Sequence, residues 1–317
     1  MVRMEGVSIS PERDAALLHE LTEPIAGLLN AHLARADDKM WYPHEFVPFD
    51  QAKTFPPDYQ WSPEEYPLSD GARSALYVNL LTEDNLPYYS SLIVNIAGDP
   101  DHPMAEWGRR WTAEEDRHSD VMRGWVHATR ALDPRWLEDG RMAQMSRGEV
   151  PQPATFAELL AYTSLQELAT QVAHRNTLRH VTDVAGKKML GKVAGDEHLH
   201  YEFYVGAAQV GFEVDPSTMM IALAKQLRGF KMPGTGIIGF EDHSKHIAEA
   251  DIYGLTHFHD HVVWPVIERL DIEKYANGSL SPEAERAHEG LIKTLSSLTR
   301  ASNIFAAAQQ KRRDALV

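Results

Sequence analysis

The feature that most constrains the fold is a unit that occurs twice along the chain. Each copy consists of a segment with helical periodicity that carries one glutamate, followed by a second such segment that carries Glu-x-x-His. Residues three apart lie on the same face of a helix, so each Glu-x-x-His pair projects from one side. The six positions, in chain order, are Glu83, Glu115, His118, Glu167, Glu197 and His200.

Continuing each helix face from the six by steps of three and four reaches mostly apolar residues, which places the six on stripes that face a core. The stripe residues are Leu76, Leu80, Pro87, Trp107, Trp111, Met122, Leu160, Thr163, Thr170, Leu190, Val193 and Tyr204. Burying four carboxylates without compensation is prohibitively costly, so facing helices can hold them only around cations. One Glu from each of two helices and Glu-x-x-His from each of two others is the pattern of di-iron carboxylate bundles, in which two Fe²⁺ balance four negative charges.

The alternative explanation is that these side chains are solvated glutamates and histidines with ordinary hydrogen bonds. A third Glu-x-x-His pair, Glu285 with His288, shows that the motif alone is weak evidence. That pair lacks a second helix with a partner carboxylate, and we expect it at the surface. The repetition of the whole unit favours a metal site for the other two pairs.

Strand signals are sparse and apolar residues recur three and four apart, which predicts an all-α fold. We expect a ferritin-like four-helix bundle with additional helices, in one domain over residues 1–317 whose bundle core spans about 71–211. The expected segments are a helix over 12–36, an extended arm over 39–70, bundle helices over 71–97, 103–132, 155–184 and 187–211, a loop over 140–154, and further helices over 212–317. Pro87 is expected to kink the first bundle helix, and Thr155 with Glu158 has the form of a capping box.

Composition narrows the chemistry and the partners. The chain has 317 residues with 16 His and no Cys, which excludes disulfides, thiolate zinc sites and self-ligated iron–sulfur clusters. The 31 Lys and Arg against 46 Asp and Glu give a net charge of −15, which disfavours binding to nucleic acid. No stretch has the length and apolarity of a membrane span, and the first residues lack the apolar run of a secretion signal. We therefore expect a cytoplasmic protein.

Five longer stretches of sequence, four of which contain the six positions, match those of a known protein family: WYPHEF, LTEDNLPYY, WTAEEDRHSD, LQELATQVAHRNT and GDEHLHYE. With them the chain resembles the soluble acyl-acyl-carrier-protein desaturases of plant plastids and actinobacteria, over roughly residues 39–275. Two departures stand out. Plant members usually carry Lys-Arg between the last Glu and His, where this chain has His198 and Leu199, and the segment after Pro233 is unlike theirs.

The resemblance implies that the six positions ligate two iron ions per chain. It also implies that Trp41 and Asp196 form an electron or hydrogen-bond route to His118, and that Thr170 lies beside the face that binds oxygen. The implied reaction uses O₂ to introduce a cis double bond into a fatty acyl chain carried on acyl-carrier protein, with electrons from ferredoxin. A homodimer is implied as well. A chain without Cys cannot carry its own iron–sulfur centre, which agrees with an external electron donor.

Three other functions compete with this one. A ferritin-like iron store would share the bundle, but this chain continues for more than 100 residues beyond it. A radical-generating ribonucleotide reductase subunit would carry a Tyr one turn after the first ligand His, where this chain has Met122. The nearer rival is a di-iron oxygenase or hydroxylase that acts on a carrier-bound acyl substrate, because the same oxidant can transfer oxygen instead of removing a second hydrogen.

The remaining motifs are weaker. The G-x-G-x-x-G over 234–239 follows no strand, so we interpret it as a loop rather than a nucleotide site. The His257, His259 and His261 cluster sits in a helical pattern, and we expect it on a helix surface. Lys225, Arg228 and Lys231 form either a stripe for an acidic carrier protein or a solvated helix face. Leu92 and Ile96 line an acyl channel or belong to the ordinary core.

Overall fold

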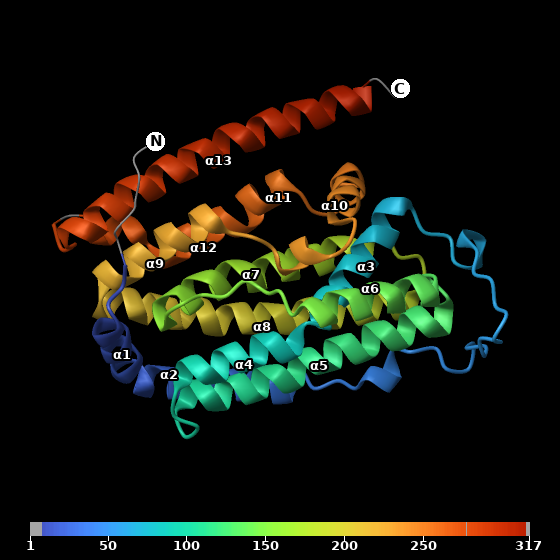
Figure 1. Ribbon diagram of the computed structural model, residues 1–317, viewed down its shortest axis with the longest axis horizontal. Helices are drawn as coiled ribbons and strands as arrows, with labels where there is room; N and C mark the ends of the chain where they lie inside the picture. Colours follow the sequence, from blue (N-terminus) through green and yellow to red (C-terminus); the bar gives the residue numbers. More distant parts are fainter. Residues whose placement is uncertain (1–7, 277, 315–317) are drawn as a thin grey trace.

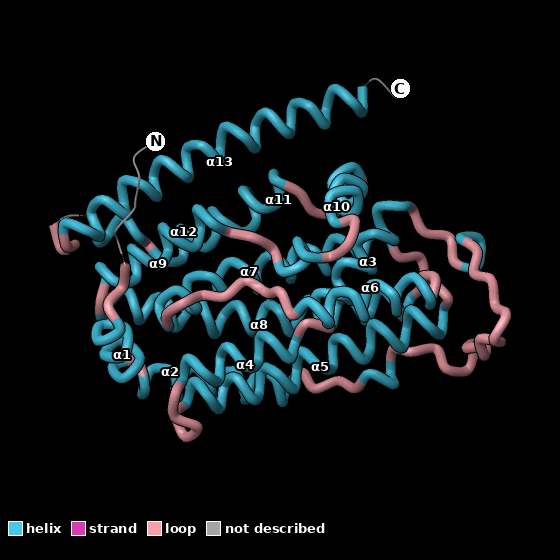
Figure 2. Tube along the Cα trace, viewed as in Figure 1, coloured by secondary structure: helices cyan, strands magenta, loops and turns pink. Residues whose placement is uncertain are grey.

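The computed structural model describes residues 8–276 and 278–314, and within them the chain is helical with no strand (Figure 2). The expected all-α fold is confirmed. The expectation of a single domain over residues 1–317 stays a prediction. Residues 1–7, 277 and 315–317 of that range lie outside the described residues. Among the described helices, none combines the length and apolarity needed to cross a membrane.

Four helical segments form the central bundle (Figure 1). They are α3 (Asp70–Glu83) continued by α4 (Leu86–Ala97), α5 (Pro103–Thr129), α7 (Phe156–Thr177) and α8 (Val184–Val214). Helix α3 packs against α5 and α7, and α8 packs against the same two helices, so the four close into a ring. The four bundle segments expected from the sequence are present. Helix α8 extends a few residues further at each end than expected, whereas α7 ends at Thr177 instead of near residue 184.

Two helices expected to be continuous are interrupted, and proline explains both breaks. The segment expected as one helix over 12–36 is α1 (Pro11–Glu20) followed by α2 (Thr22–Asp38). The first bundle helix is not merely kinked at Pro87, because α3 ends at Glu83 before α4 begins. A proline has no N–H and its ring crowds the carbonyl four residues earlier. Pro24 and Pro87 each stand four residues after the last residue of the interrupted helix.

The expectation of a loop over 140–154 is wrong for the first half of that range. Helix α6 (Pro134–Arg147) occupies that stretch, and the preceding helix α5 ends at Thr129 instead of near residue 132. Asp133 caps α6 by accepting a hydrogen bond from the Arg135 N–H at 2.9 Å, with proline at the first position. Gly148, at φ 63°, ends the helix in the left-handed conformation that glycine adopts without strain.

The start of α7 forms only half of the expected capping box. The Thr155 hydroxyl accepts a hydrogen bond from the Glu158 N–H at 3.2 Å. The Glu158 carboxylate does not return to the cap residue, because it accepts from the Ala154 N–H at 3.2 Å and also pairs with Lys225.

The N-terminal and C-terminal segments cover the bundle. Helix α2 lies on α5 and α8, and the expected arm over 39–70 is irregular apart from two short 3₁₀ turns, Pro43–Glu45 and Pro63–Glu65. The expected C-terminal helices are present, and α13 runs along one edge of the molecule against α9 (Figure 1). They are α9 (Pro216–Gly229), α10 (Phe240–Glu249), α11 (Leu255–Phe258), a π-helical turn (His259–Val263), α12 (Trp264–Leu270) and α13 (Pro282–Asp314), with 3₁₀ turns at Pro233–Gly236 and Ile272–Tyr275.

The apolar core consists of two clusters. The larger one joins α1, α2 and α4 to the C-terminal helices, and the smaller one joins the arm to α3, α6 and the ends of α5 and α8. Of the bundle helices, α5 and α8 contribute to both clusters. The buried polar side chains described next lie on α3, α5, α7 and α8.

Candidate metal centre

The six side chains singled out in the sequence meet inside the bundle. Helix α3 supplies one glutamate, α7 another, and α5 and α8 each supply a glutamate and a histidine from their Glu-x-x-His pairs. None of the six exposes more than 6% of its surface. The break after α3 places Glu83 at the end of its helix.

The six side chains form two groups that share two glutamates. Glu83 and His118 belong to one group and Glu167 and His200 to the other, with Glu115 and Glu197 common to both. Within each group one ligand atom of every residue lies within 4.8 Å of the others. Glu115 and Glu197 would therefore be available to both of two cations, one held by each group.

The shared glutamates turn one oxygen toward each histidine. Glu115 places Oε2 3.2 Å from His118 Nδ1 and Oε1 2.9 Å from His200 Nδ1. Glu197 places Oε1 3.6 Å from His118 Nδ1 and Oε2 3.8 Å from His200 Nδ1. Each shared carboxylate is therefore oriented to bridge the two halves of the site.

The buried carboxylates of the site repel one another, and nearby cations would stabilise their charged forms. Burial and the neighbouring carboxylates Glu115 and Glu197 raise the pKa of Glu83 well above its usual value, and burial with the same neighbours raises the pKa of Glu167. Burial alone would raise the pKa of Glu115, but the imidazoles of His118 and His200 hold it below its usual value. Without cations the carboxylates must share protons to coexist.

One buried ligand atom, Glu167 Oε2, has no hydrogen-bond partner. It lies 3.8 Å from His200 Nδ1, another member of its group. Carboxylate oxygens and imidazole nitrogens together suit iron and similar divalent metals. The residues present therefore fit the metal centre that the sequence pattern predicts.

The residues expected beside His118 lie there. His118 Nε2 is 3.3 Å from Asp196 Oδ2, which accepts hydrogen bonds from Trp41 Nε1 at 2.9 Å and from Arg117 at 2.6 Å. The Trp41 ring is stacked parallel to the His118 ring, with centroids 6.4 Å apart. The structure thus brings Trp41 and Asp196 to the expected histidine, and their part in electron transfer stays a prediction.

Thr170 lies one turn after Glu167 on α7. Its hydroxyl is 3.0 Å from Glu197 Oε2 and 2.9 Å from the Glu167 carbonyl oxygen. Its side chain also lines two cavities that reach the site. The expected place beside the centre is therefore observed, while its role toward oxygen stays a prediction.

Sequence reasoning missed four residues that contact the six. Glu114 Oε2 accepts hydrogen bonds from His200 Nε2 and from His32 Nε2. Trp111, seen only as part of an apolar stripe, donates to Glu167 Oε1 at 3.2 Å. Burial lowers the pKa of His174 to about 4, so its neutral ring can donate from Nε2 to Glu83 Oε1 at 3.1 Å. His174 falls on the same helix face as Glu167 and Thr170, so its spacing was a usable signal; His32 offered none.

Most of the weaker sequence motifs lie where we expected them, with one exception. Glu285 is exposed on α13, as expected, and neither it nor His288 belongs to a metal-competent group among the described residues. The segment over 234–239 is a loop with a 3₁₀ turn, as expected. His261 is exposed, but the surface expectation is wrong for His259, which is buried and bonded to Thr299 at 2.9 Å. His259 lies three and four residues before Val262 and Val263, which are buried, and so falls on the inward face of this stretch.

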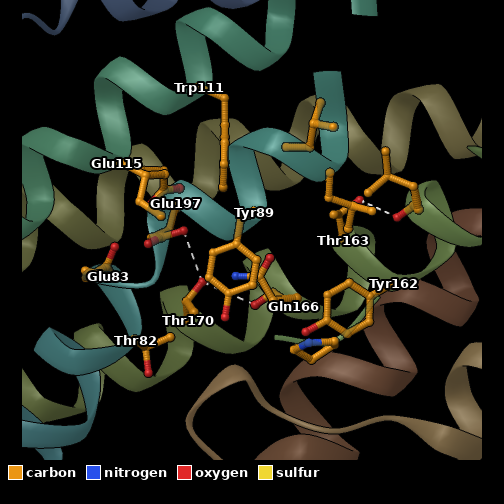
Figure 3. Close-up of a pocket in the computed structure, with 15 residues that line it drawn as sticks. Thr82, Glu83, Tyr89, Trp111, Glu115, Tyr162, Thr163, Gln166, Thr170 and Glu197 are labelled. Atoms are coloured by element: carbon orange, nitrogen blue, oxygen red, sulfur yellow. Dashed lines mark hydrogen bonds between the residues drawn. The ribbon is translucent and has the colours of Figure 1, made fainter. Parts of the chain in front are cut away.

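Two cavities reach the candidate centre, and both are lined by Thr82, Glu83 and Thr170. The larger has a volume of about 410 Å³, lies between α3, α7 and the segment from α9 to α11, and is mainly apolar. The smaller, about 40 Å³, is a slot between α4 and α7. Figure 3 shows the acidic side chains gathered at one end of this slot and Tyr162 with Thr163 at the other.

A family model described as fatty acid desaturase matches residues 13–316. The chain belongs to the fatty acid desaturase family. DesA1 of Mycobacterium tuberculosis, named as an acyl-acyl-carrier-protein desaturase, is 34% identical to it over 312 residues, which span 95% of this desaturase and 90% of the relative. The chloroplastic stearoyl-acyl-carrier-protein 9-desaturase 1 of Arabidopsis thaliana is 29% identical over 293 residues, covering 86% of this desaturase and 74% of the relative.

A solved structure shows the same fold. The crystal structure of the acyl-ACP desaturase DesA2 from Mycobacterium tuberculosis covers 86% of this desaturase and 99% of its own chain, with a TM-score of 0.65 at 23% identity. The expected ferritin-like helical fold is thereby confirmed.

The six-residue site makes a prediction for metal content. After anaerobic loading with Fe²⁺ and removal of free metal, we expect two irons per chain, measured by elemental analysis. Glu197→Ala removes a carboxylate shared by both groups, so we expect it to lose most of the iron, and His200→Ala to lose at least one equivalent. His288→Ala is the matched control and should retain both. A wild-type chain with far less than two irons would contradict the site.

The pKa shifts predict how stability depends on pH. In the metal-free desaturase, Glu83 and Glu167 have folded-state pKa values above their unfolded values, so the stability they contribute is lost as pH rises through the folded values. Metal ligands must be deprotonated, so stabilisation by Fe²⁺ should grow over the same range. Melting temperatures from about pH 5 to about pH 8 should show the iron-induced increase becoming larger. In the metal-free Glu167→Gln variant the loss with rising pH should be smaller; an equal loss would contradict the assignment.

Proposed function

We propose that this desaturase holds two iron ions at the six-residue site and uses O₂ to introduce a cis double bond into a fatty acyl chain carried on acyl-carrier protein, with electrons from ferredoxin. The observation that carries the proposal is the pair of ligand groups sharing Glu115 and Glu197 at a place where apolar cavities reach the bundle interior. The relatives named as desaturases of acyl groups on acyl-carrier protein support the substrate class.

Metal ions are needed because an unactivated methylene is too weak an acid for a His or Glu base. Glu83, His118, Glu167 and His200, with the two shared glutamates, would hold them. Iron bound there supplies the activation of O₂ that hydrogen abstraction requires. The chain itself keeps the donors in place and excludes water, since the ligand side chains are almost fully buried.

The two cavities support an acyl chain passing beside the centre. The larger cavity is walled by apolar side chains including Val78, Ile252 and Phe258, and Lys231 stands among its lining residues. The slot continues past Thr170 toward Leu92 and Leu159. Apolar walls bind methylene groups by removing them from water. Of the two candidate channel residues, Leu92 lines the slot, whereas Ile96 packs against the larger core cluster.

The carrier protein would dock near Lys231. Of the basic stripe, Lys225 is paired with Glu158, while Lys231 lines the larger cavity and Arg228 is exposed on the same segment. These two cations can attract an acidic carrier in an otherwise acidic protein. Ferredoxin, the homodimer and the cytoplasmic location remain predictions from the family resemblance.

The decisive test of the proposed function is product analysis. Iron-loaded protein is incubated with acyl-carrier protein bearing a saturated chain, together with ferredoxin, its reductase, NADPH and O₂. We expect an acyl product that is lighter by two hydrogens, and mass spectrometry locates its double bond. A product heavier by one oxygen would favour the hydroxylase alternative and contradict desaturation, as would the absence of any product from a chain that holds its iron.

The route of the acyl chain can be tested by filling the larger cavity. Ala173 on α7 lines it, so Ala173→Phe places an aromatic ring in the space while leaving the six ligands unchanged. We expect turnover to fall by at least about tenfold while the iron content stays at the wild-type level. Ala306→Phe on the exposed face of α13 is the matched control. Turnover at the wild-type rate in Ala173→Phe would contradict this route.

A further inference from the structure

Each histidine of the candidate centre turns its second nitrogen outward, to an acidic residue on the opposite helix. His118 Nε2 faces Asp196, which directly precedes the shared Glu197 on α8. His200 Nε2 lies 3.0 Å from Glu114 Oε2, which directly precedes the shared Glu115 on α5. Each motif therefore reads acidic-Glu-x-x-His, and each supplies the outer partner of the other motif's histidine.

The two outer carboxylates are held by the same kinds of group. Asp196 accepts from the Trp41 ring N–H and from Arg117, as described above. Glu114 accepts from His32 Nε2 at 2.8 Å and from Arg110 Nε at 2.6 Å. Trp41 and His32 both come from the N-terminal segment, and both arginines come from α5. His32 thus occupies the place on the His200 side that Trp41 occupies on the His118 side.

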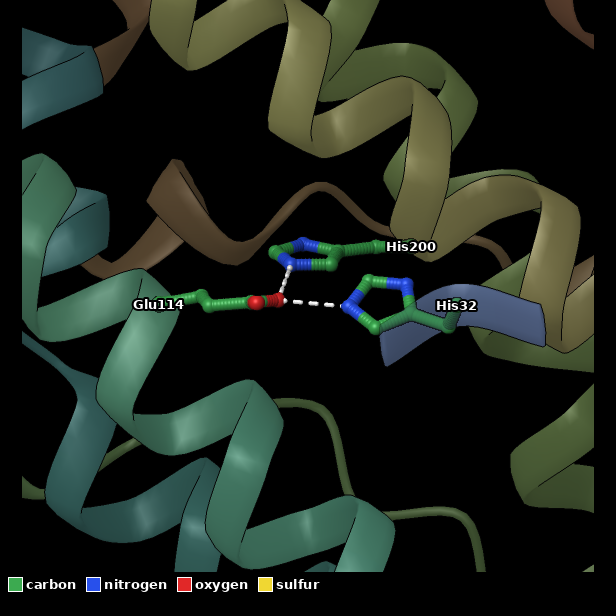
Figure 4. A group of neighbouring side chains, drawn as sticks. All are labelled: His32, Glu114 and His200. Carbon is green, nitrogen blue, oxygen red and sulfur yellow. Dashed lines mark hydrogen bonds and ion pairs between the residues drawn. The ribbon is translucent and has the colours of Figure 1, made fainter. Parts of the chain in front are cut away.

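The His32 ring is fixed by packing as well as by its hydrogen bond. It is 4% exposed, meets the Trp107 ring edge-on with centroids 4.8 Å apart, and is stacked over the His200 ring at 5.8 Å. Figure 4 shows Glu114 reaching from α5 toward the two rings, with both hydrogen bonds ending on one oxygen. A ring held this firmly can fix the position of the carboxylate it binds.

The same three side chains are close enough to hold a metal ion, but their chemistry argues against one. Arg110 already supplies a positive charge to Glu114, and a cation placed beside it would be repelled. His200 would also have to ligate through both nitrogens at once. A hydrogen-bond chain satisfies the three groups without these costs, with His200 donating from Nε2 and leaving Nδ1 for the centre.

We propose that His32 is a positioning residue for His200, acting through Glu114. It orients the carboxylate that receives the Nε2–H of His200, and so fixes the ring orientation and the nitrogen presented to the metal. Glu114 is the direct outer partner of His200, and loss of such a partner changes metal affinity by about 10–100-fold. The proposal rests on the metal centre of the proposed function, and it assigns His32 to one of the two metal positions only, the one that includes Glu167.

The test measures iron binding and spectra rather than activity alone. In His32→Phe the ring and its packing stay while the donor is lost, so anaerobic Fe²⁺ titration should show one of the two sites weakened by about 10–100-fold. Mössbauer spectra should change for one iron only, and Trp41→Phe should change the other. His32→Gln restores an N–H donor at a similar reach, and we expect it to recover binding. His19→Phe, at an exposed position on α1, is the matched control.

If His32→Phe does not fold, a second variant tests the same proposal. Glu114→Gln keeps the side-chain shape and should weaken the same iron. Unchanged binding, equal weakening of both irons, or no recovery in His32→Gln would overturn the proposal. A wild-type chain that binds no iron would instead overturn the metal centre itself, so the two failures are distinguishable.

Discussion

Four glutamate carboxylates share one buried space in this desaturase, and the rest of the structure is organised around the charge they bring. Their mutual repulsion and their removal from water would unfold the bundle unless cations or protons neutralise them. Glu83 and Glu167, which belong to one ligand group each, have the raised pKa values, whereas Glu115 lies between both imidazoles and keeps its charge more easily. The site is therefore built to receive positive charge at two positions.

The repeated motif organises more than the ligands. Because the acidic residue before each shared glutamate receives the histidine of the opposite helix, α5 and α8 are tied together on the outer side of the site as well as through the shared carboxylates. The N-terminal segment closes both outer contacts through His32 and Trp41. On the other side of the site, the cavities reach Glu83 and Thr170. One face is thus sealed by hydrogen bonds, and the other is open to an apolar substrate.

The sequence was sufficient to find the six side chains that meet in the bundle, because their spacing is local. Each Glu-x-x-His pair falls on one helix face, and the apolar stripe shows which face is buried. The outer partners could not be found this way, since His32 lies 82 residues from Glu114 and joins it only through the packing of α2. The helix breaks could have been found, because Pro24 and Pro87 act on carbonyls four residues earlier. Helix α6 carried its Asp-Pro start and Gly end in the sequence. The burial of His259 could also have been found, because Val262 and Val263 follow it at helical spacing.

The two-iron centre is tested most directly by a crystal structure of the iron-loaded chain with anomalous differences measured at the iron absorption edge. We expect two peaks, one among Glu83, His118 and the two shared glutamates, and the other among Glu167, His200 and the same two glutamates. A single peak, or a peak among His32, Glu114 and His200, would contradict the two-iron centre.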